Sequence, residues 1–191
     1  MATNRLVEKS KVEVYAGTLF NAANEEGAQD TVVTVRNQFA KLLTLIYADM
    51  DLIVALSNRD YTEDQRLELG RAVFADCDPA LRETLAIMAK NLDAGLVSRV
   101  FHEYEQLMAD KLNLCVMDVE TVVPLDDNLR NLIKEKTEAD LGCKAVLNES
   151  IDKSILGGII MSVNGKRIDA SVASQLNRAR YTLKENDGGE N

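Results

Sequence analysis

The stretch that decides the fold lies near the C-terminus and reads DKSILGGIIMSVNGKRIDASV, residues 152–172. Residues 159–163 are largely apolar and prone to form a strand, Asn164-Gly165 is typical of a two-residue hairpin turn, and residues 166–168 return as a short partner strand. Ser171 then stands where it can cap a helix. The segment carries no nucleophile, metal cluster or phosphate loop, so we interpret it as a surface for contact with another protein.

Two glycines open the first of these strands. Gly157 and Gly158 have no Cβ, so the backbone can bend sharply there or approach another element closely. Phosphate loops also follow a strand, but neither G-x-x-x-x-G-K nor G-x-G-x-x-G is present. The helix after Ser171 has an apolar face that begins with Val172 and Leu176. The pair therefore predicts a crowded packing site and not a nucleotide site.

Composition narrows the class of protein. The 191 residues allow one domain or two small ones, and 46% hydrophobic with 28% charged residues is typical of a globular chain. The net charge of −9 disfavours nucleic acid as a partner, because binding phosphates needs clustered Lys and Arg. Apolar stretches stay well short of the ~20 residues that span a bilayer. We expect a soluble intracellular chain that reaches a membrane only through its partners.

The three cysteines give a weaker signal. Cys77, Cys115 and Cys143 are odd in number, far apart in sequence and without a C-x-x-C pair. This pattern predicts reduced and mostly buried thiols.

Apolar residues recur at helical spacing through the first 112 residues. One face runs from Val12 to Ala23 and another from Val32 to Ile46, with Gly27 between them, which predicts two antiparallel helices. Further helix signals are a short apolar piece at 52–56, a capping box at Thr62-Glu63-Asp64-Gln65, an Asp78-Pro79 start and a long amphipathic stretch from Val97 to Leu112. Residues 1–112 are therefore predicted to form a bundle of about six helices.

The pattern changes period near Leu114. A strand should run to Pro124, a helix from Asp126 to Gly142, and a second strand over 143–151, ahead of the hairpin and the last helix. Residues 113–185 thus predict a small α+β domain, and 186–191 a disordered tail. The fold class is α+β overall.

Candidate reactive groups are few. His102 is the single histidine, which disfavours a catalytic triad or a multi-histidine metal site, and its helical neighbours are polar. Acidic pairs such as Asp76 with Asp78 and Asp126 with Asp127 are explained by helix caps and solvated charge. We expect no catalytic residue, no cofactor and no metal. The face from Tyr15 to Ala23 stays open to two interpretations, core packing or a shallow groove for another helix.

Two segments carry a resemblance to a known family. Residues 14–23, VYAGTLFNAA, resemble the Tyr-Ala-x-Ala-Leu-Phe-x-x-Ala segment that opens the delta subunit of F-type ATP synthases, the oligomycin sensitivity conferring protein of mitochondria. The C-terminal match is closer and comprises Asp152, Gly157, Gly158, Ile168, Asp169, Ser171, Val172 and Leu176. Lys153 and Ala170 depart from the usual Pro and Gly, and Gly17 from a larger residue. The resemblance covers residues from about Val12 to Leu183.

The resemblance implies a non-catalytic stator subunit that joins the catalytic head to the peripheral stalk, so that proton-driven rotation is coupled to ATP synthesis. By family likeness, one copy per complex would bind the N-terminal helix of an alpha subunit with its first and fifth helices. The expected contacts there are Tyr15, Leu19, Ala22, Ala23, Leu81, Leu85 and Met88. The C-terminal domain would take the end of the b subunit on a surface shaped by Gly157, Gly158, Ile168 and Val172.

Two interpretations compete with the stator. A free-standing helical adaptor or regulator would show the same helical bundle, and an enzyme would need a reactive cluster that the sequence does not assemble. The start of the chain lacks transit-peptide features, which favours a bacterial protein held at the cytoplasmic face of the cell membrane through its complex, although a processed organelle form would look the same.

Overall fold

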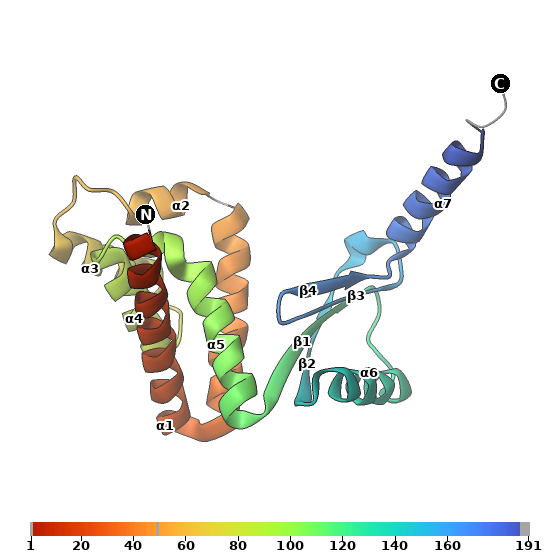
Figure 1. Cartoon of the computed structure of the whole chain (residues 1–191), viewed down its shortest axis with the longest axis horizontal. Helices are drawn as coiled ribbons and strands as arrows, with labels where there is room; N and C mark the ends of the chain where they lie inside the picture. The colour runs from red at the N-terminus through yellow and green to blue at the C-terminus, as the bar shows by residue number, and fades with distance from the viewer. Residues whose placement is uncertain (1, 49, 188–191) are drawn as a thin grey trace. The chain divides into compact units, whose positions relative to one another are not determined.

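The computed structural model describes residues 2–48 and 50–187, and the chain divides after Leu112 into two units that are described one at a time. Within the described residues, unit 1 is built from helices alone, whereas unit 2 combines a four-stranded sheet with α-helices (Figure 1). The α+β fold class predicted from the sequence is confirmed.

Unit 1 starts its helices where the local signals place them. In chain order its elements are α1 (Ala2–Ala48), α2 (Met50–Leu56), α3 (Glu63–Val73), α4 (Pro79–Lys90), the 3-10 turn η1 (Ala94–Leu96) and α5 (Val97–Leu112). The predicted capping box opens α3, because Gln65 N donates to Thr62 Oγ1 at 3.3 Å and Thr62 N donates to Gln65 Oε1 at 2.9 Å. Asp78 Oδ1 accepts from Ala80 N at 3.0 Å and so caps α4.

Helix α1 reverses direction within its length. Glu8 bonds Arg99 at 2.9 Å, while the Phe39 ring lies 5.3 Å from that of Phe101, only two residues further along α5. A straight helix would separate Glu8 from Phe39 by roughly 46 Å. The first and last parts of α1 therefore run in opposite directions beside α5, as Figure 1 shows. The predicted antiparallel arrangement of the two apolar faces is confirmed. The predicted division into two helices at Gly27 is wrong, because the helical conformation continues through it.

The core of unit 1 forms where both arms of α1 meet α5. Tyr104 is fully buried, packs edge-on against Phe20 with ring centroids 6.0 Å apart, and donates its hydroxyl to Val32 O at 3.1 Å. Burial raises the pKa of Tyr104 well above its ordinary value. Arg36 and Glu105 form a buried ion pair at 2.6 Å. Each of these contacts ties one arm of α1 to α5.

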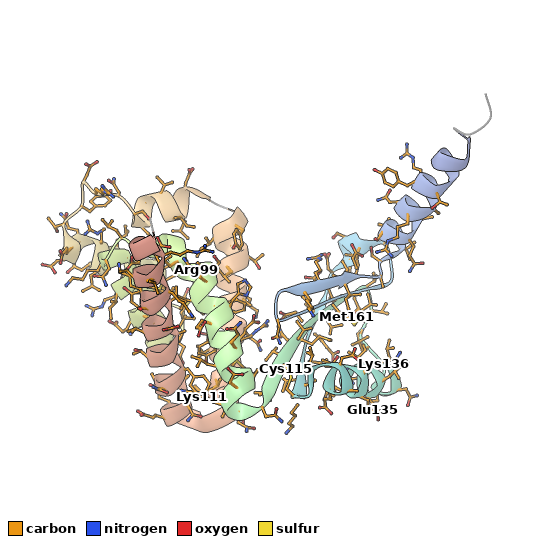
Figure 2. All side chains as sticks on the ribbon, in the orientation of Figure 1. Arg99, Lys111, Cys115, Glu135, Lys136 and Met161 are labelled. Atoms are coloured by element: carbon orange, nitrogen blue, oxygen red, sulfur yellow. A yellow bond between two sulfur atoms is a disulfide. The ribbon has the colours of Figure 1, made fainter. Side chains whose placement is uncertain are left out.

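Unit 2 is a mixed sheet with α6 on one face. Its elements are β1 (Leu114–Thr121), α6 (Asp127–Leu141), β2 (Lys144–Ile151), the 3-10 turn η2 (Lys153–Ile155), β3 (Ile159–Val163), β4 (Lys166–Asp169) and α7 (Val172–Asp187). The strand order is β2-β1-β3-β4, with β1 parallel to β2 and antiparallel to β3. Ile133 of α6 packs in one cluster with Met117, Val119 and Val163 of the sheet. Figure 2 labels Met161, which borders this cluster on β3.

The hairpin and the last helix form as the sequence predicts, with one difference at the end. Asn164 and Gly165 have φ of 47° and 75°, the positive values that a two-residue hairpin turn of this kind requires. Ser171 Oγ accepts from Ser174 N at 3.2 Å and caps α7. Helix α7 continues through Asp187, so the first two residues of the tail expected to be disordered are helical. The remaining tail residues, 188–191, lie outside the described part of the chain.

The two adjacent glycines lie where the hairpin meets α7. Gly158 has φ of 89°, and a Cβ on it would lie 2.5 Å from Ala170 O. Gly157 O accepts from Val172 N at 2.9 Å. The pair thus fixes the start of α7 against the first residues of β3, and the expected crowded site is confirmed.

A disulfide corrects the cysteine prediction. Cys115, labelled on β1 in Figure 2, is bonded to Cys143, with the two Cα atoms 6.1 Å apart. The sequence predicts reduced thiols because the two residues lie 28 positions apart. Parallel pairing brings them together, since Leu114 is aligned with Lys144, which follows Cys143 directly. Cys77 stays a free thiol, and burial raises its pKa.

Replacing Gly158 by alanine tests the close approach. We expect Gly158→Ala to lower the free energy of unfolding of unit 2 by about 2–4 kcal/mol, because the new methyl group meets backbone atoms and the left-handed φ is strained. Gly142→Ala is the matched control: its φ is also positive, at 68°, but no atom lies within 4 Å of the new Cβ, so only the backbone cost of about 1 kcal/mol remains. Urea denaturation measures both, and equal losses would contradict the packing.

Candidate partner-binding surfaces

The predicted contact residues of unit 1 fall into two groups. Most of them lie in the core of the bundle, with exposures of 2% or less: Leu19, Ala23, Leu81, Leu85 and Met88. Tyr15 and Ala22 are half-buried and occupy one face of α1, because seven residues are close to two helical turns. The structure thus separates residues that support this side of the bundle from residues that another chain can touch.

A polar network joins this face of α1 to the end of α4. Lys11 Nζ donates to both carboxylate oxygens of Asp93, at 2.7 and 2.9 Å. Tyr15 OH donates to Asp93 Oδ2 at 3.0 Å and accepts from Asn91 Nδ2 at 2.8 Å. These four residues are called the α1–α4 clasp below. The clasp fixes the separation of the two helices at one end of the surface between them.

The environment of the clasp shifts two pKa values. The hydrogen bond from Lys11 to Asp93 is the largest influence and raises the pKa of Lys11. Burial is the largest influence on Tyr15 and raises the pKa of its hydroxyl, with the Asn91 hydrogen bond acting in the opposite direction. Lys11 is therefore charged and Tyr15 neutral at physiological pH, which is the protonation state that the clasp needs.

Ile87 is the contact candidate that the sequence prediction missed. It is 43% exposed on α4, four residues before Asn91, which bonds Tyr15. Residues four apart share a helix face, so Ile87 lies on the side of α4 that meets α1. In the sequence Ile87 does not belong to the helical repeat formed by Leu81, Leu85 and Met88. An apolar residue outside that repeat is the signal that could have identified it as exposed. Tyr15, Thr18, Ala22 and Ile87 are called the α1–α4 surface below.

In unit 2 the structure brings together three of the four predicted residues. A Cβ on Gly157 would lie 3.2 Å from Val172 Cγ2, and one on Gly158 would lie 3.1 Å from Val172 N. Ile168 is on β4, opposite Met161 in the ladder, and is 55% exposed. The glycines thus act through close packing, while Val172 and Ile168 offer apolar surface.

An exposed apolar patch extends along α7 from the glycine pair. Leu156 precedes Gly157 and is 76% exposed, and Leu176, one turn beyond Val172 on the same face, is 61% exposed. Leu156, Val172 and Leu176 are called the α7 patch below. Exposed apolar residues grouped in this way are typical of protein interaction sites. Leu156 was not predicted, because nothing in the sequence distinguishes it from the apolar residues around it.

Candidate metal ligands do not cluster in the described residues. Residues 2–48 and 50–187 contain no group of three His, Cys, Asp or Glu side chains that could hold a metal ion. His102 is 57% exposed and lies 3.6 Å from Glu105. No helix in the described part of the chain is long and apolar enough to cross a bilayer. Two units with exposed apolar surfaces define a protein that binds other chains.

Comparison with known proteins gives the family. The family model described as ATP synthase delta (OSCP) subunit matches residues 12–183, and the chain belongs to that family. The ATP synthase subunit delta of Prochlorococcus marinus is 28% identical over 173 residues, 90% of this chain and 94% of that protein. The subunit delta of Azorhizobium caulinodans is 28% identical over 173 residues, 90% of this chain and 91% of its own length.

A solved structure shares the fold. A chain in the cryo-EM structure of the Toxoplasma gondii mitochondrial ATP synthase hexamer has a TM-score of 0.51 and 17% identity, and the match covers 90% of this chain and 96% of that one. With the family established, the chain is a non-catalytic peripheral-stalk subunit of the F-type ATP synthase and works as part of that complex. The resemblance noted in the sequence is confirmed, and the free-standing adaptor is set aside.

Removing the carboxylate of the clasp should loosen unit 1. Asp93→Ala deletes the acceptor of both Lys11 and Tyr15, so we expect the free energy of unfolding to fall by about 2 kcal/mol. Asp76→Ala, at an exposed position, is the control and should change it by less than about 0.5 kcal/mol. Urea unfolding followed by circular dichroism compares the two. Similar stabilities for both variants would show that the clasp contributes nothing.

Proposed function

We propose that this chain holds the catalytic head of the ATP synthase to its peripheral stalk by binding one partner helix on each unit. Unit 1 receives the N-terminal helix of an alpha subunit on the α1–α4 surface. Unit 2 receives the C-terminal end of the b subunit at the α7 patch. The link keeps the head from turning with the rotor, so that proton-driven rotation is coupled to ATP synthesis.

The observation that carries the proposal for unit 1 is apolar surface on both helices that the clasp joins: Ile87 is exposed on α4, and Tyr15 and Ala22 are half-buried on α1. Small and aromatic side chains on α1 opposite an aliphatic one on α4 suit the apolar stripe of an amphipathic helix. The predicted residues Leu19, Ala23, Leu81, Leu85 and Met88 contribute as the packed floor beneath this surface. The clasp sets the width between the two helices before a partner arrives, which lowers the entropy cost of binding.

For unit 2 the support comes from the glycine pair and the α7 patch. Gly157 and Gly158 hold the first turn of α7 against the hairpin, so Val172 projects from a fixed position. Ile168 on the edge strand β4 adds exposed apolar area four residues earlier in the chain. A helical end of b can cover this area.

The energetics suit a stator. A helix buried in a groove with about 800 Å² per partner can reach nanomolar affinity, roughly −12 kcal/mol. Two contacts on one chain then reinforce each other, because binding of the first partner raises the effective concentration of the second. The bundle and the sheet can therefore hold the head against torque without any catalytic group.

Placement in the cell follows from the proposal. One copy per complex joins one head to one stalk. The protein is peripheral at the cytoplasmic face of the membrane, reached through the complex, in keeping with the finding that no described helix is long and apolar enough to cross a bilayer.

A charge on the α1–α4 surface should abolish the alpha contact. We expect Ile87→Asp to weaken binding of a synthetic peptide of the first ~25 alpha-subunit residues by more than tenfold, about 1.4 kcal/mol, because the carboxylate must lose water in the interface. Isothermal titration calorimetry of the full chain measures the affinity.

The matched control is Leu45→Asp, which places the same charge on the last arm of α1 at a residue 66% exposed. It should bind as the wild type does. If Ile87→Asp keeps its circular dichroism spectrum and binds the peptide with unchanged affinity, the α1–α4 surface is not the alpha site.

A charge on the α7 patch of unit 2 should weaken the contact with the b subunit. Leu176→Asp should weaken binding of a peptide from the C-terminal end of b by more than tenfold, since it charges the α7 patch. Tyr181→Asp is the control: Tyr181 is 71% exposed on the same helix but about 140° away around its axis. Fluorescence anisotropy with the labelled b peptide separates them. If both variants lose the same affinity for the b peptide, or if neither loses any, the α7 patch is not the b site.

A further inference from the structure

We propose that the bond between Cys115 and Cys143 is a reversible, redox-controlled lock on the β1–α6–β2 crossover of unit 2. The two residues lie near the starts of the two parallel strands: Cys115 is the second residue of β1, and Cys143 directly precedes β2. The bond therefore closes a loop that contains the whole of α6. Opening and closing it changes the stability of the sheet on which the rest of unit 2 is built.

The position of the disulfide allows it to stabilise the pairing of β1 with β2. Parallel strands such as β1 and β2 have no tight turn between them and are connected only through the long crossover helix. Lys144 N donates to Asn113 O at 2.8 Å, so the ladder begins beside the disulfide. A cross-link here restricts the unfolded chain across the entire crossover, and restriction of that kind stabilises more as the loop lengthens.

The disulfide is buried in the apolar cluster between α6 and the sheet. Cys115 and Cys143 are 3% and 7% exposed and belong to the same apolar cluster as Met117 and Ile133. Loss of the bond is therefore felt directly in the contact between α6 and the sheet. The β1–β3 ladder then connects this cluster to the strand that Gly158 joins to α7.

Exchange should begin at Cys143. It follows Gly142, which ends α6 in a left-handed conformation with open space on its Cβ side, so local fraying of the helix end uncovers this sulfur first. Cys115 is held inside a ladder strand. It is paired with Ala145 of β2 and is 3% exposed, so its sulfur stays protected until the β1–β2 ladder opens.

The chemistry is ordinary thiol–disulfide exchange. The thiolate of a low-molecular-weight thiol attacks Sγ of Cys143, the S–S bond breaks, and Sγ of Cys115 leaves as a thiolate that takes a proton. A second thiol attacks the outer sulfur of the mixed disulfide and releases Cys143 as a thiol. Two thiols are oxidised to one small-molecule disulfide, and the protein disulfide gains two electrons and two protons. Oxidised glutathione reverses each step.

Alkylation of the full chain counts the thiols. N-ethylmaleimide, added under denaturing conditions without reductant, should modify Cys77 alone, and all three cysteines after treatment with dithiothreitol. Intact mass spectrometry reads the number of labels. Three labels on the protein purified without reductant and then treated with oxidised glutathione would overturn the proposal.

Thermal unfolding measures the lock itself. Dithiothreitol should lower the Tm of unit 2 by roughly 10–20 °C, from the loop-closure entropy and the small size of the unit. Cys77→Ala should show the same shift, whereas Cys115→Ala combined with Cys143→Ala should show none. A shift that persists in the double variant, or no shift in the wild type, would contradict the lock.

Single variants test where exchange starts. With oxidised glutathione under native conditions, Cys115→Ser should form a mixed disulfide at Cys143 much faster than Cys143→Ser forms one at Cys115. Equal rates would place the opening in the whole sheet and reject the end of α6 as the entry point. These measurements do not involve partner binding, so they stand or fall independently of the proposed stator contacts.

Discussion

Unit 1 depends on the packing of both arms of α1 against α5. Tyr104 touches both arms, through the Phe20 ring and the Val32 carbonyl. The buried pair of Arg36 with Glu105 adds a second contact between α5 and the last arm. An uncompensated buried charge is costly, so each member of that pair needs the other in place. Because α5 holds the hairpin formed by α1, the outer side of its first arm is free to face α4. The α1–α4 surface exists as a consequence of that core.

Unit 2 depends on the connection between its two parallel strands, β1 and β2. Its parallel strands need a crossover helix, and α6 supplies both the connection and the cover for one face of the sheet. The disulfide closes this crossover at one end, while Gly158 fixes α7 at the hairpin. Leu156, Val172 and Leu176 of the α7 patch stay exposed. In both units the regular apolar stripes supply most of the core.

This division explains what the sequence could and could not predict. Local chemistry sets the helix starts at Thr62 and Asp78 and the turn at Asn164-Gly165, and these signals need no knowledge of distant residues. Helical spacing placed Tyr15 and Leu19 on one apolar face but could not show that Leu19 is buried and Tyr15 only half-buried, because exposure depends on which neighbour covers a face. Likewise, the disulfide depends on strand pairing between residues far apart in the chain. The reversal of α1 occurred without the expected break, since the helical conformation runs through Gly27.

To join the head to the stalk, one chain must hold a head helix and a stalk helix at the same time. The most direct test is analytical ultracentrifugation of the full chain with a labelled alpha N-terminal peptide and a differently labelled peptide from the C-terminal end of b. We predict a single species that contains one copy of each, with the two labels sedimenting together only when the chain is present. Separate binary complexes that never carry both labels would contradict the account, because a stator that releases one partner on binding the other cannot join the head to the stalk.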